Sequence, residues 1–145
     1  MKKVTKSTKK GFTLVELIVV LVILAVLAAM LVPALTGYIQ RARQEKDYQM
    51  AATVLTACQS AATYQYAVDT KGATSYKIEG TTPSGNGVTV MDLIGDASGK
   101  VKNISFTAND KGVITKGDVE INGYKYSWEA ASATWTATKA AAATT

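Results

Sequence analysis

The sequence predicts an α+β protein in which one long N-terminal helix packs on a small antiparallel β-sheet. Residues 12–32 form an almost uninterrupted apolar run, and a helical pattern continues from there to about residue 67. From residue 68 onward the composition shifts to Gly, Thr, Ser, Asn and β-branched residues, which is typical of short strands joined by turns. A helix followed by a run of strands indicates the α+β class.

The excess positive charge of the chain is confined to its first residues. The 145 residues carry a net charge of +5, from 16 basic and 11 acidic side chains. Five lysines and no acid precede Gly11, which leaves 16 − 5 = 11 basic side chains against 11 acidic ones beyond it. The basic balance therefore belongs to a leader, residues 1–11, and nucleic-acid binding is not indicated.

The apolar run is long enough to cross a membrane. Its 21 residues, Phe12 to Val32, span about 31 Å as a helix, and only Thr13 and Glu16 among them are polar. Fifteen of the 21 are Phe, Leu, Ile or Val, so the free energy of insertion outweighs the cost of one acid near the helix end. The lysines before the run and the mixed charges after it predict a cytoplasmic N-terminus, a transmembrane segment at residues 12–33 and an external remainder.

A charged side chain within a membrane span is costly and is by default a functional hypothesis. Glu16 is such a residue, because it lies four positions after Phe12 in an otherwise apolar stretch. A plain signal anchor with an incidental glutamate is one alternative. An ordinary secretory signal peptide with a cleavage site at Val26 and Ala28 is another, but the apolar run exceeds the usual length and a charge inside it is unhelpful.

The stretch KKGFTLVELIVVLVILAVLAAMLVP resembles the N-terminal signature of type IV pilins and of the related pseudopilins of type II secretion and competence systems. The resemblance rests on a basic leader ending in Gly11, on Phe12, on Glu16, and on an unbroken apolar helix reaching Pro33. It implies the type IV pilin fold, with no cofactor. It also implies that a membrane-embedded prepilin peptidase cleaves between Gly11 and Phe12 and methylates the new amino group of Phe12.

Such cleavage places a positive amine at Phe12, one helical turn from Glu16. The two groups either neutralise each other within one chain or pair between neighbouring copies, and pairing between copies removes the penalty of an unpaired buried carboxylate. Repeating one contact whose rotation does not close yields a helical filament. We therefore expect assembly to depend on Phe12, Glu16 and a helix softened near Pro33.

The partners that the resemblance implies are further copies of the chain, the prepilin peptidase and methyltransferase, a cytoplasmic assembly ATPase and a membrane platform protein. The precursor would lie in the cytoplasmic membrane, and the mature chain in a filament on the cell surface. A pseudopilin, a minor pilin acting as an adhesin, and an anchored enzyme or receptor with an unrelated head remain alternatives. The presence of Glu16 favours a major subunit over a minor subunit at the tip.

Residues 34–67 change from uniformly apolar to amphipathic. Pro33 predicts a kink, because it lacks a backbone donor and crowds the carbonyl of Ala29. The expected apolar stripe comprises Leu35, Ile39, Ala42, Met50 or Ala51, Val54 or Leu55, Cys58, Ala61 and Ala62. The expected polar face comprises Gln40, Arg43, Gln44, Asp47 and Gln59.

Cys58 lies on the apolar stripe and is the only cysteine in the sequence, so no intrachain disulfide is possible. A small buried thiol is the expected role. Many pilins of two-membrane bacteria carry a disulfide near the C-terminus. The departure from that pattern favours a single-membrane, Gram-positive source.

Residues 68–145 predict a β-rich head. The expected elements are strands at 75–78, 101–108, 113–121, 124–129 and 134–138, and one helical turn at 90–94. The dipeptide Asn122-Gly123 between alternating runs is a strong hairpin signal. Tyr124, Tyr126 and Trp128 fall on one face of the next strand and are expected in the core. Residues 139–145 are expected to form a disordered tail.

No catalytic or metal-binding residue is predicted. The chain has no histidine and a single cysteine, so the usual zinc ligand sets and Ser-His or Cys-His pairs cannot be built. Ser98-Gly99-Lys100 is similar to the end of a phosphate-binding loop, but Ile94 replaces the required glycine and Val101 the final Ser or Thr. We therefore predict a structural protein rather than an enzyme.

Overall fold

The computed structural model of the protein describes residues 11–96 and 98–140. The chain divides into two compact units between Ala42 and Arg43. Leader residues 1–10, and residues 141–145 of the expected tail, lie outside the described residues.

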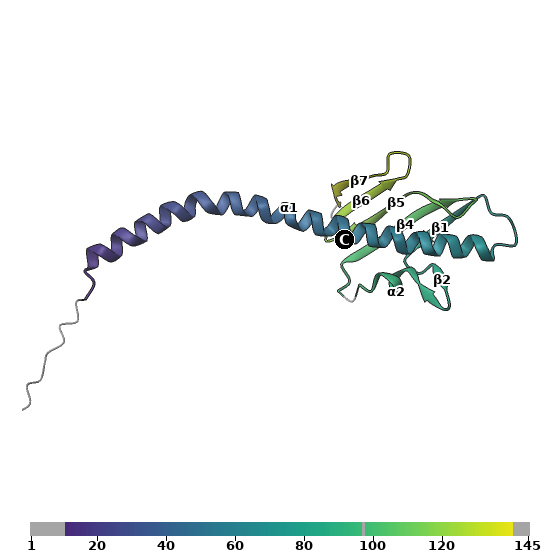
Figure 1. The fold of residues 1–145 in the computed structure, drawn as a ribbon, viewed down its shortest axis with the longest axis horizontal. Coiled ribbons are helices and arrows are strands. Elements are labelled where there is room, and N and C mark those ends of the chain that lie inside the picture. The colour runs from purple at the N-terminus through teal and green to yellow at the C-terminus, as the bar shows by residue number, and fades with distance from the viewer. Residues whose placement is uncertain (1–10, 97, 141–145) are drawn as a thin grey trace, which may run out of the picture. The chain divides into compact units, whose positions relative to one another are not determined.

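The predicted α+β class is confirmed (Figure 1). The elements are α1 (Leu14–Val68), β1 (Ser75–Glu79), β2 (Pro83–Gly85), β3 (Val88–Thr89), α2 (Val90–Ile94), β4 (Val101–Asn109), β5 (Ile114–Ile121), β6 (Tyr124–Glu129) and β7 (Thr134–Lys139). The last strand includes Lys139, which was expected to begin the tail, and the N–H of Ala140 donates to the Gly123 carbonyl over 2.9 Å. Pairing with β6 thus continues to the end of the described chain.

The helix α1 continues on both sides of Pro33, so the proline does not end it (Figure 1). Pro33 leaves the carbonyl of Ala29 without its usual helical donor. One turn later the hydroxyl of Thr36 donates to the carbonyl of Pro33 over 2.8 Å, which gives this stretch of backbone an additional local bond.

The side chains of α1 in the first unit are exposed throughout the described range, 11–42. Leu35 and Ile39, expected on the buried stripe, are 57% and 41% exposed. That expectation was wrong for both residues and for Ala42, which is also exposed, because nothing in the described part of the first unit packs against them. The buried positions of α1 begin at Asp47.

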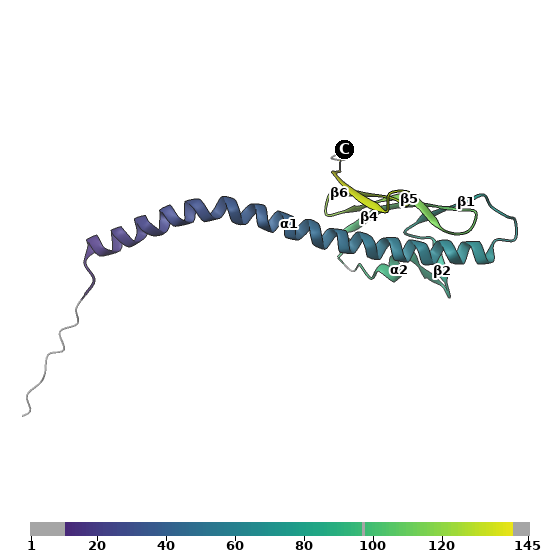
Figure 2. The same cartoon turned by 45° about the horizontal axis from the view of Figure 1, so that its top comes forward.

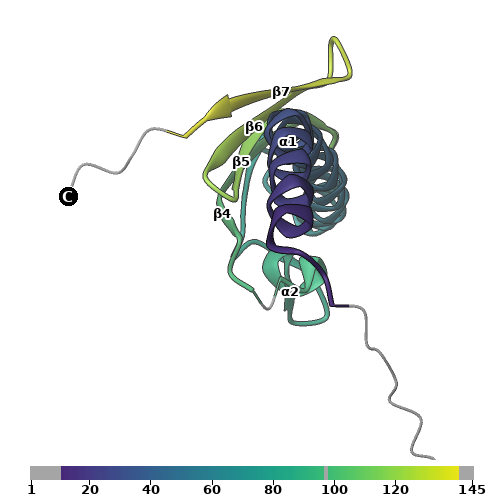
Figure 3. The same ribbon diagram turned by 90° about the vertical axis from the view of Figure 1, so that its left-hand side faces the viewer.

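The second unit contains a five-stranded antiparallel sheet of order β1-β4-β5-β6-β7 and a two-stranded sheet of β2 and β3. Within this unit α1 has the large sheet on one side, and α2 with the β2–β3 hairpin on another (Figures 2 and 3). Asn122 and Gly123 join β5 to β6 with φ of 53° and 79°, as a type I′ turn requires. The same dipeptide at Asn86-Gly87 joins β2 to β3, a hairpin that the sequence analysis did not predict.

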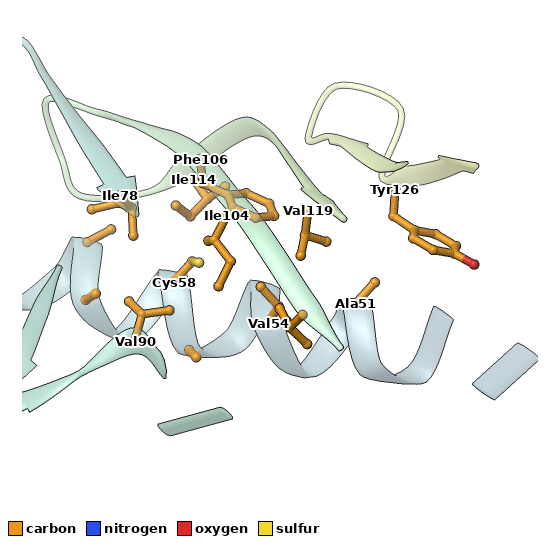
Figure 4. Packing of buried hydrophobic residues seen from close by; sticks show 14 of the residues in the cluster. Ala51, Val54, Cys58, Ile78, Val90, Ile104, Phe106, Ile114, Val119 and Tyr126 are labelled. Atoms are coloured by element: carbon orange, nitrogen blue, oxygen red, sulfur yellow. The ribbon is translucent and has the colours of Figure 1, made fainter. Parts of the chain in front are cut away.

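The core of the second unit lies between α1 and the sheet. Ala51, Val54 and Cys58 of α1 point toward the sheet, and Phe106 and Val119 approach them from β4 and β5 (Figure 4). Cys58 is fully buried, and burial raises the pKa of its thiol to about 12. The thiol is therefore protonated near neutral pH, in keeping with the expected packing role.

The aromatic side chains of β6 are buried to different extents. Tyr126 is fully buried and packs edge-on against Tyr48, with ring centroids 5.2 Å apart. Trp128 is half-buried beside Trp135 of β7, at 5.3 Å. Tyr124 remains 36% exposed, so the expected core row is only partly covered.

Two polar side chains of α1 hold the sheet in position. Asp47 is 6% exposed and accepts hydrogen bonds from the Asn122 amide at 2.7 Å and the Tyr126 hydroxyl at 3.2 Å. Gln59 donates to the carbonyl of Gly112 at 2.7 Å and accepts from the N–H of Ile114 at 2.9 Å.

Asp47 and Gln59 were both assigned to the polar face of the helix, and this assignment was wrong. The two side chains reach turns of the sheet whose positions the sequence pattern does not reveal. Each then satisfies polar groups that packing would otherwise leave without partners.

Replacing Asp47 with Ala should destabilise the second unit, because the buried hydroxyl of Tyr126 then loses its acceptor. We expect a loss of about 1–3 kcal/mol in the free energy of unfolding. Thermal unfolding of the full-length protein in detergent, followed by circular dichroism, measures it. Glu79→Ala is the control, because the exposed Glu79 carboxylate pairs with the exposed Lys77 at 2.8 Å. Equal melting temperatures for both variants would contradict this role of Asp47.

Candidate assembly site

The helix α1 begins with a reciprocal pair of hydrogen bonds between Thr13 and Glu16. The backbone N–H of Thr13 donates to Oε2 of Glu16 at 2.9 Å, and the N–H of Glu16 donates to the Thr13 hydroxyl at 3.3 Å. This arrangement is a capping box, with Thr13 at the N-cap and Glu16 three residues on. It satisfies two backbone donors that the first turn of a helix otherwise leaves open.

The capping box occupies only part of the hydrogen-bonding capacity of the Glu16 carboxylate. The bond to Thr13 uses Oε2, and each carboxylate oxygen has two lone-pair sites. Oε1 therefore remains able to accept a hydrogen bond from a second, positively charged donor. The negative charge of Glu16 is not neutralised by the neutral donors of Thr13.

The surroundings of this carboxylate are apolar. A hollow of about 580 Å³ at the start of α1 is lined by Phe12, Val15, Glu16, Leu17, Val19 and Val20. Phe12 is 84% exposed and Leu14 is 75% exposed. The structure thus brings Phe12 and Glu16 to one surface at the N-terminal end of the helix, where they were predicted to act together.

The expected cleavage position lies just before the helix. Gly11 and Phe12 precede the first residue of α1 and are exposed, so the peptide bond between them is not part of the helical ladder. A Cβ added to Gly11 would meet no atom within 4 Å. Internal packing in the described chain therefore does not account for glycine at this position. Pro33 lies within α1, apart from this group of residues.

The head offers a second hollow, but without convergent charged groups. It has a volume of about 820 Å³ and lies between α1 and the strands β5 and β6. The larger side chains that line it are Leu55, Tyr64 and Trp128. Gln59 and neighbouring hydroxyl side chains supply its polar atoms. Across residues 11–96 and 98–140, no three His, Cys, Asp or Glu side chains gather as metal ligands would.

Comparison with known proteins identifies the N-terminal segment. Residues 6–32 match the family model of the prokaryotic N-terminal methylation motif. The matched segment is the signal of type IV pilins and pseudopilins, and the fold behind it is consistent with the pilin fold. No curated protein and no solved structure matches the chain.

The described part of the chain also has one helix, α1, that is long and apolar enough to cross a membrane. Together with the matched signal, it supports a membrane-anchored precursor of the pilin or pseudopilin type. The motif is that of a structural subunit and not of an enzyme family.

Thr13 is the residue of this group that the sequence analysis did not single out. The signal was present, because Thr-x-x-Glu immediately before an apolar run is the sequence pattern of a capping box. Glu16 was singled out because of its charge, whereas Thr13 was considered only as part of the N-terminal motif.

Thr13→Ala should weaken the first turn of α1, whereas Thr13→Ser should preserve it. Loss of an N-cap hydroxyl costs about 1 kcal/mol, which corresponds to about a fivefold change in local opening. Hydrogen exchange at the Glu16 amide, measured by NMR on the full-length protein in micelles, should accelerate by that factor in Thr13→Ala only. Unchanged exchange in Thr13→Ala would show that the capping box does not stabilise the turn.

Proposed function

We propose that this chain is the structural subunit of a type IV pilus. Its N-terminal helix polymerises after cleavage between Gly11 and Phe12 and methylation of the Phe12 amine. The observation that carries the proposal is the combination of an exposed apolar half-helix with an acid whose second carboxylate oxygen is available. The mature chain runs from Phe12 onward and retains the whole of α1.

The apolar half of α1 supports polymerisation because it needs a cover other than water. Large side chains such as Leu21 and Leu31 are 64% and 66% exposed. Lipid covers them in the precursor, and the same half-helix of other copies covers them in a filament. Moving the helix from lipid into a bundle changes its apolar burial little, so polar contacts decide the arrangement.

Glu16 supplies that polar contact. In the precursor the Phe12 nitrogen is part of a peptide bond and carries no charge. Cleavage turns it into an ammonium, and the ammonium of one copy meets Oε1 of Glu16 in its neighbour. A buried ion pair adds little net stability, but an unpaired carboxylate is strongly disfavoured, so the pair fixes the axial register of otherwise interchangeable helices.

The proposal also implies how the precursor is oriented in the membrane and which proteins process and assemble it. The basic leader lies in the cytoplasm and the head outside, as the distribution of lysines predicts. A prepilin peptidase processes the leader. A cytoplasmic ATPase acting with a membrane platform then lifts the subunit into the filament on the cell surface. A pseudopilin of a secretion or DNA-uptake system is the second candidate, because the matched motif is common to both classes.

Substitutions at Glu16 separate its two tasks. Glu16→Ala removes the charge and the carboxylate that accepts from the Thr13 N–H, and should leave membrane insertion intact while abolishing filaments. Glu16→Gln retains a side-chain carbonyl that can accept from the Thr13 N–H but lacks the charge. It should therefore form no filaments, like Glu16→Ala. Thr13→Ala loses the hydroxyl that accepts from the Glu16 N–H but keeps the charge, and should still assemble.

Electron microscopy of surface filaments, with membrane fractionation as the insertion control, measures these outcomes. Normal filaments from Glu16→Gln would contradict the register role of the charge. Filaments that are long and exposed at the surface would favour a pilus, whereas short periplasmic or envelope-bound assemblies would favour a pseudopilus.

A further inference from the structure

The edge strand β7 presents backbone hydrogen-bonding groups to the exterior. It is the last strand of the five-stranded sheet, and among residues 11–96 and 98–140 only β6 pairs with it (Figure 3). Five of its six residues are exposed, and Trp135 is half-buried. Its sequence, TWTATK, has no proline, no glycine and no acidic residue.

The direction of these groups follows from two printed hydrogen bonds. The N–H of Ala140 donates to the carbonyl of Gly123, and the N–H of Ala130 donates to the carbonyl of Thr115. Because hydrogen bonding alternates along antiparallel strands, Thr134, Thr136 and Thr138 face β6. The backbone N–H and C=O groups of Trp135, Ala137 and Lys139 therefore point away from the sheet.

Natural proteins usually protect such an edge, and the opposite edge of this sheet is protected. Strand β1 carries Lys77 and Glu79, which pair at 2.8 Å, and charged side chains on an edge oppose the docking of another strand. Strand β7 has no such pair, and its only charge is at its end. An unprotected edge rich in β-branched residues is suited to pairing with a further strand.

We propose that β7 pairs with β7 of a second copy of this chain in antiparallel orientation, centred on Ala137. In this register every outward-facing residue meets another outward-facing residue. Ala137 opposes its counterpart, and Trp135 opposes Lys139 of the other copy. Each such pair makes two backbone hydrogen bonds.

The side chains favour this pairing over a parallel one. Trp135 opposite Lys139 is a cation–π pair, and Thr136 opposite Thr138 is a favourable cross-strand pair. A parallel arrangement in the same register would place Lys139 against Lys139, which is a repulsive contact. Ala137 has a small side chain, which does not obstruct pairing at the centre of the contact.

The symmetry of the contact limits where it can occur. The two-fold axis lies midway between the two copies of Ala137 and is perpendicular to the sheet, so it reverses the direction of α1 in the second copy. Neighbours within one filament all have α1 in the same direction. The contact therefore joins two filaments of opposite direction, such as those of facing cells, and this part of the inference rests on the proposed function.

A contact made by one short strand is small beside the roughly 1,200–2,000 Å² of stable interfaces, so a single pair should be weak. Filaments repeat the edge many times, and repetition converts weak contacts into firm lateral association. Isolated subunits should thus remain mainly monomeric at this surface, while antiparallel filaments form bundles.

Disulfide trapping tests the register without requiring filaments. Ala137→Cys places two cysteines opposite each other at about 5.5 Å between Cα atoms, within reach of a disulfide. Thr136→Cys is the matched control, because its counterpart lies two residues along the partner strand, at more than about 7 Å. Cys58 does not interfere, since it is buried and its pKa is about 12.

Purified full-length protein in detergent, oxidised slowly and run on a non-reducing gel, should give at least tenfold more dimer with Ala137→Cys than with Thr136→Cys. Equal yields would overturn the proposed pairing. This result is independent of assembly, so a chain that forms no filaments would overturn the proposed function and not the strand contact.

The second experiment uses filaments. Ala137→Pro removes an outward N–H and leaves the bonds to β6 in place, because proline is tolerated where a strand faces solvent. Filament number and subunit melting temperature should equal those of the parent, while electron microscopy should show single filaments in place of bundles. Bundles that persist in Ala137→Pro, or parent filaments that never bundle, would overturn the role in lateral association.

Discussion

The first half of α1 can be stable only where something other than water covers it. Its side chains are apolar and exposed over the described length, and within them lies one carboxylate that neither lipid nor an apolar bundle solvates well. The proposed function follows from this constraint. In the proposed function, lipid covers this half of the helix before assembly, other copies of the chain cover it afterwards, and Glu16 sets how those copies align.

The second half of α1 solves a different problem, which is to hold a small sheet on a helix. Small side chains such as Ala51 and Cys58 let the strands approach closely, and apolar packing alone would tolerate sliding along the helix. Asp47 and Gln59 remove that freedom, because each binds a particular turn of the sheet. Burial of its hydroxyl, with the nearby Asp47 carboxylate, raises the pKa of Tyr126, so the phenol stays protonated as the donor of this network.

Much of the fold could be predicted from the sequence because its signals are local. The length of α1, the helical turn at 90–94 and the Asn122-Gly123 hairpin depend on neighbours in the chain, and the structure has all of them. The hydrogen bonds from α1 to the sheet could not be predicted. Asp47 and Asn122, for example, are 75 residues apart, and amphipathic spacing assigns Asp47 to the solvent side. Leu35 and Ile39 fit the helical stripe, but spacing alone does not reveal where the packed partner begins.

In the candidate site, too, features set by neighbouring residues could be predicted and those set by distant residues could not. Gly11, Phe12 and Glu16 could be found from the motif and from the cost of an intramembrane acid. The capping role of Thr13 was also local and could have been found, whereas the open edge of β7 required the strand order and the hydrogen-bond alternation.

Mass spectrometry of the mature N-terminus, on protein recovered from cells, tests the central claim most directly. The account predicts a polypeptide that begins at Phe12 and carries one methyl group on its amine, because only then does a terminal ammonium exist to meet Glu16. A chain that retains its leader, or one cut within the apolar run, has no such ammonium at this position. Either result would contradict the account of how the helices are held in register.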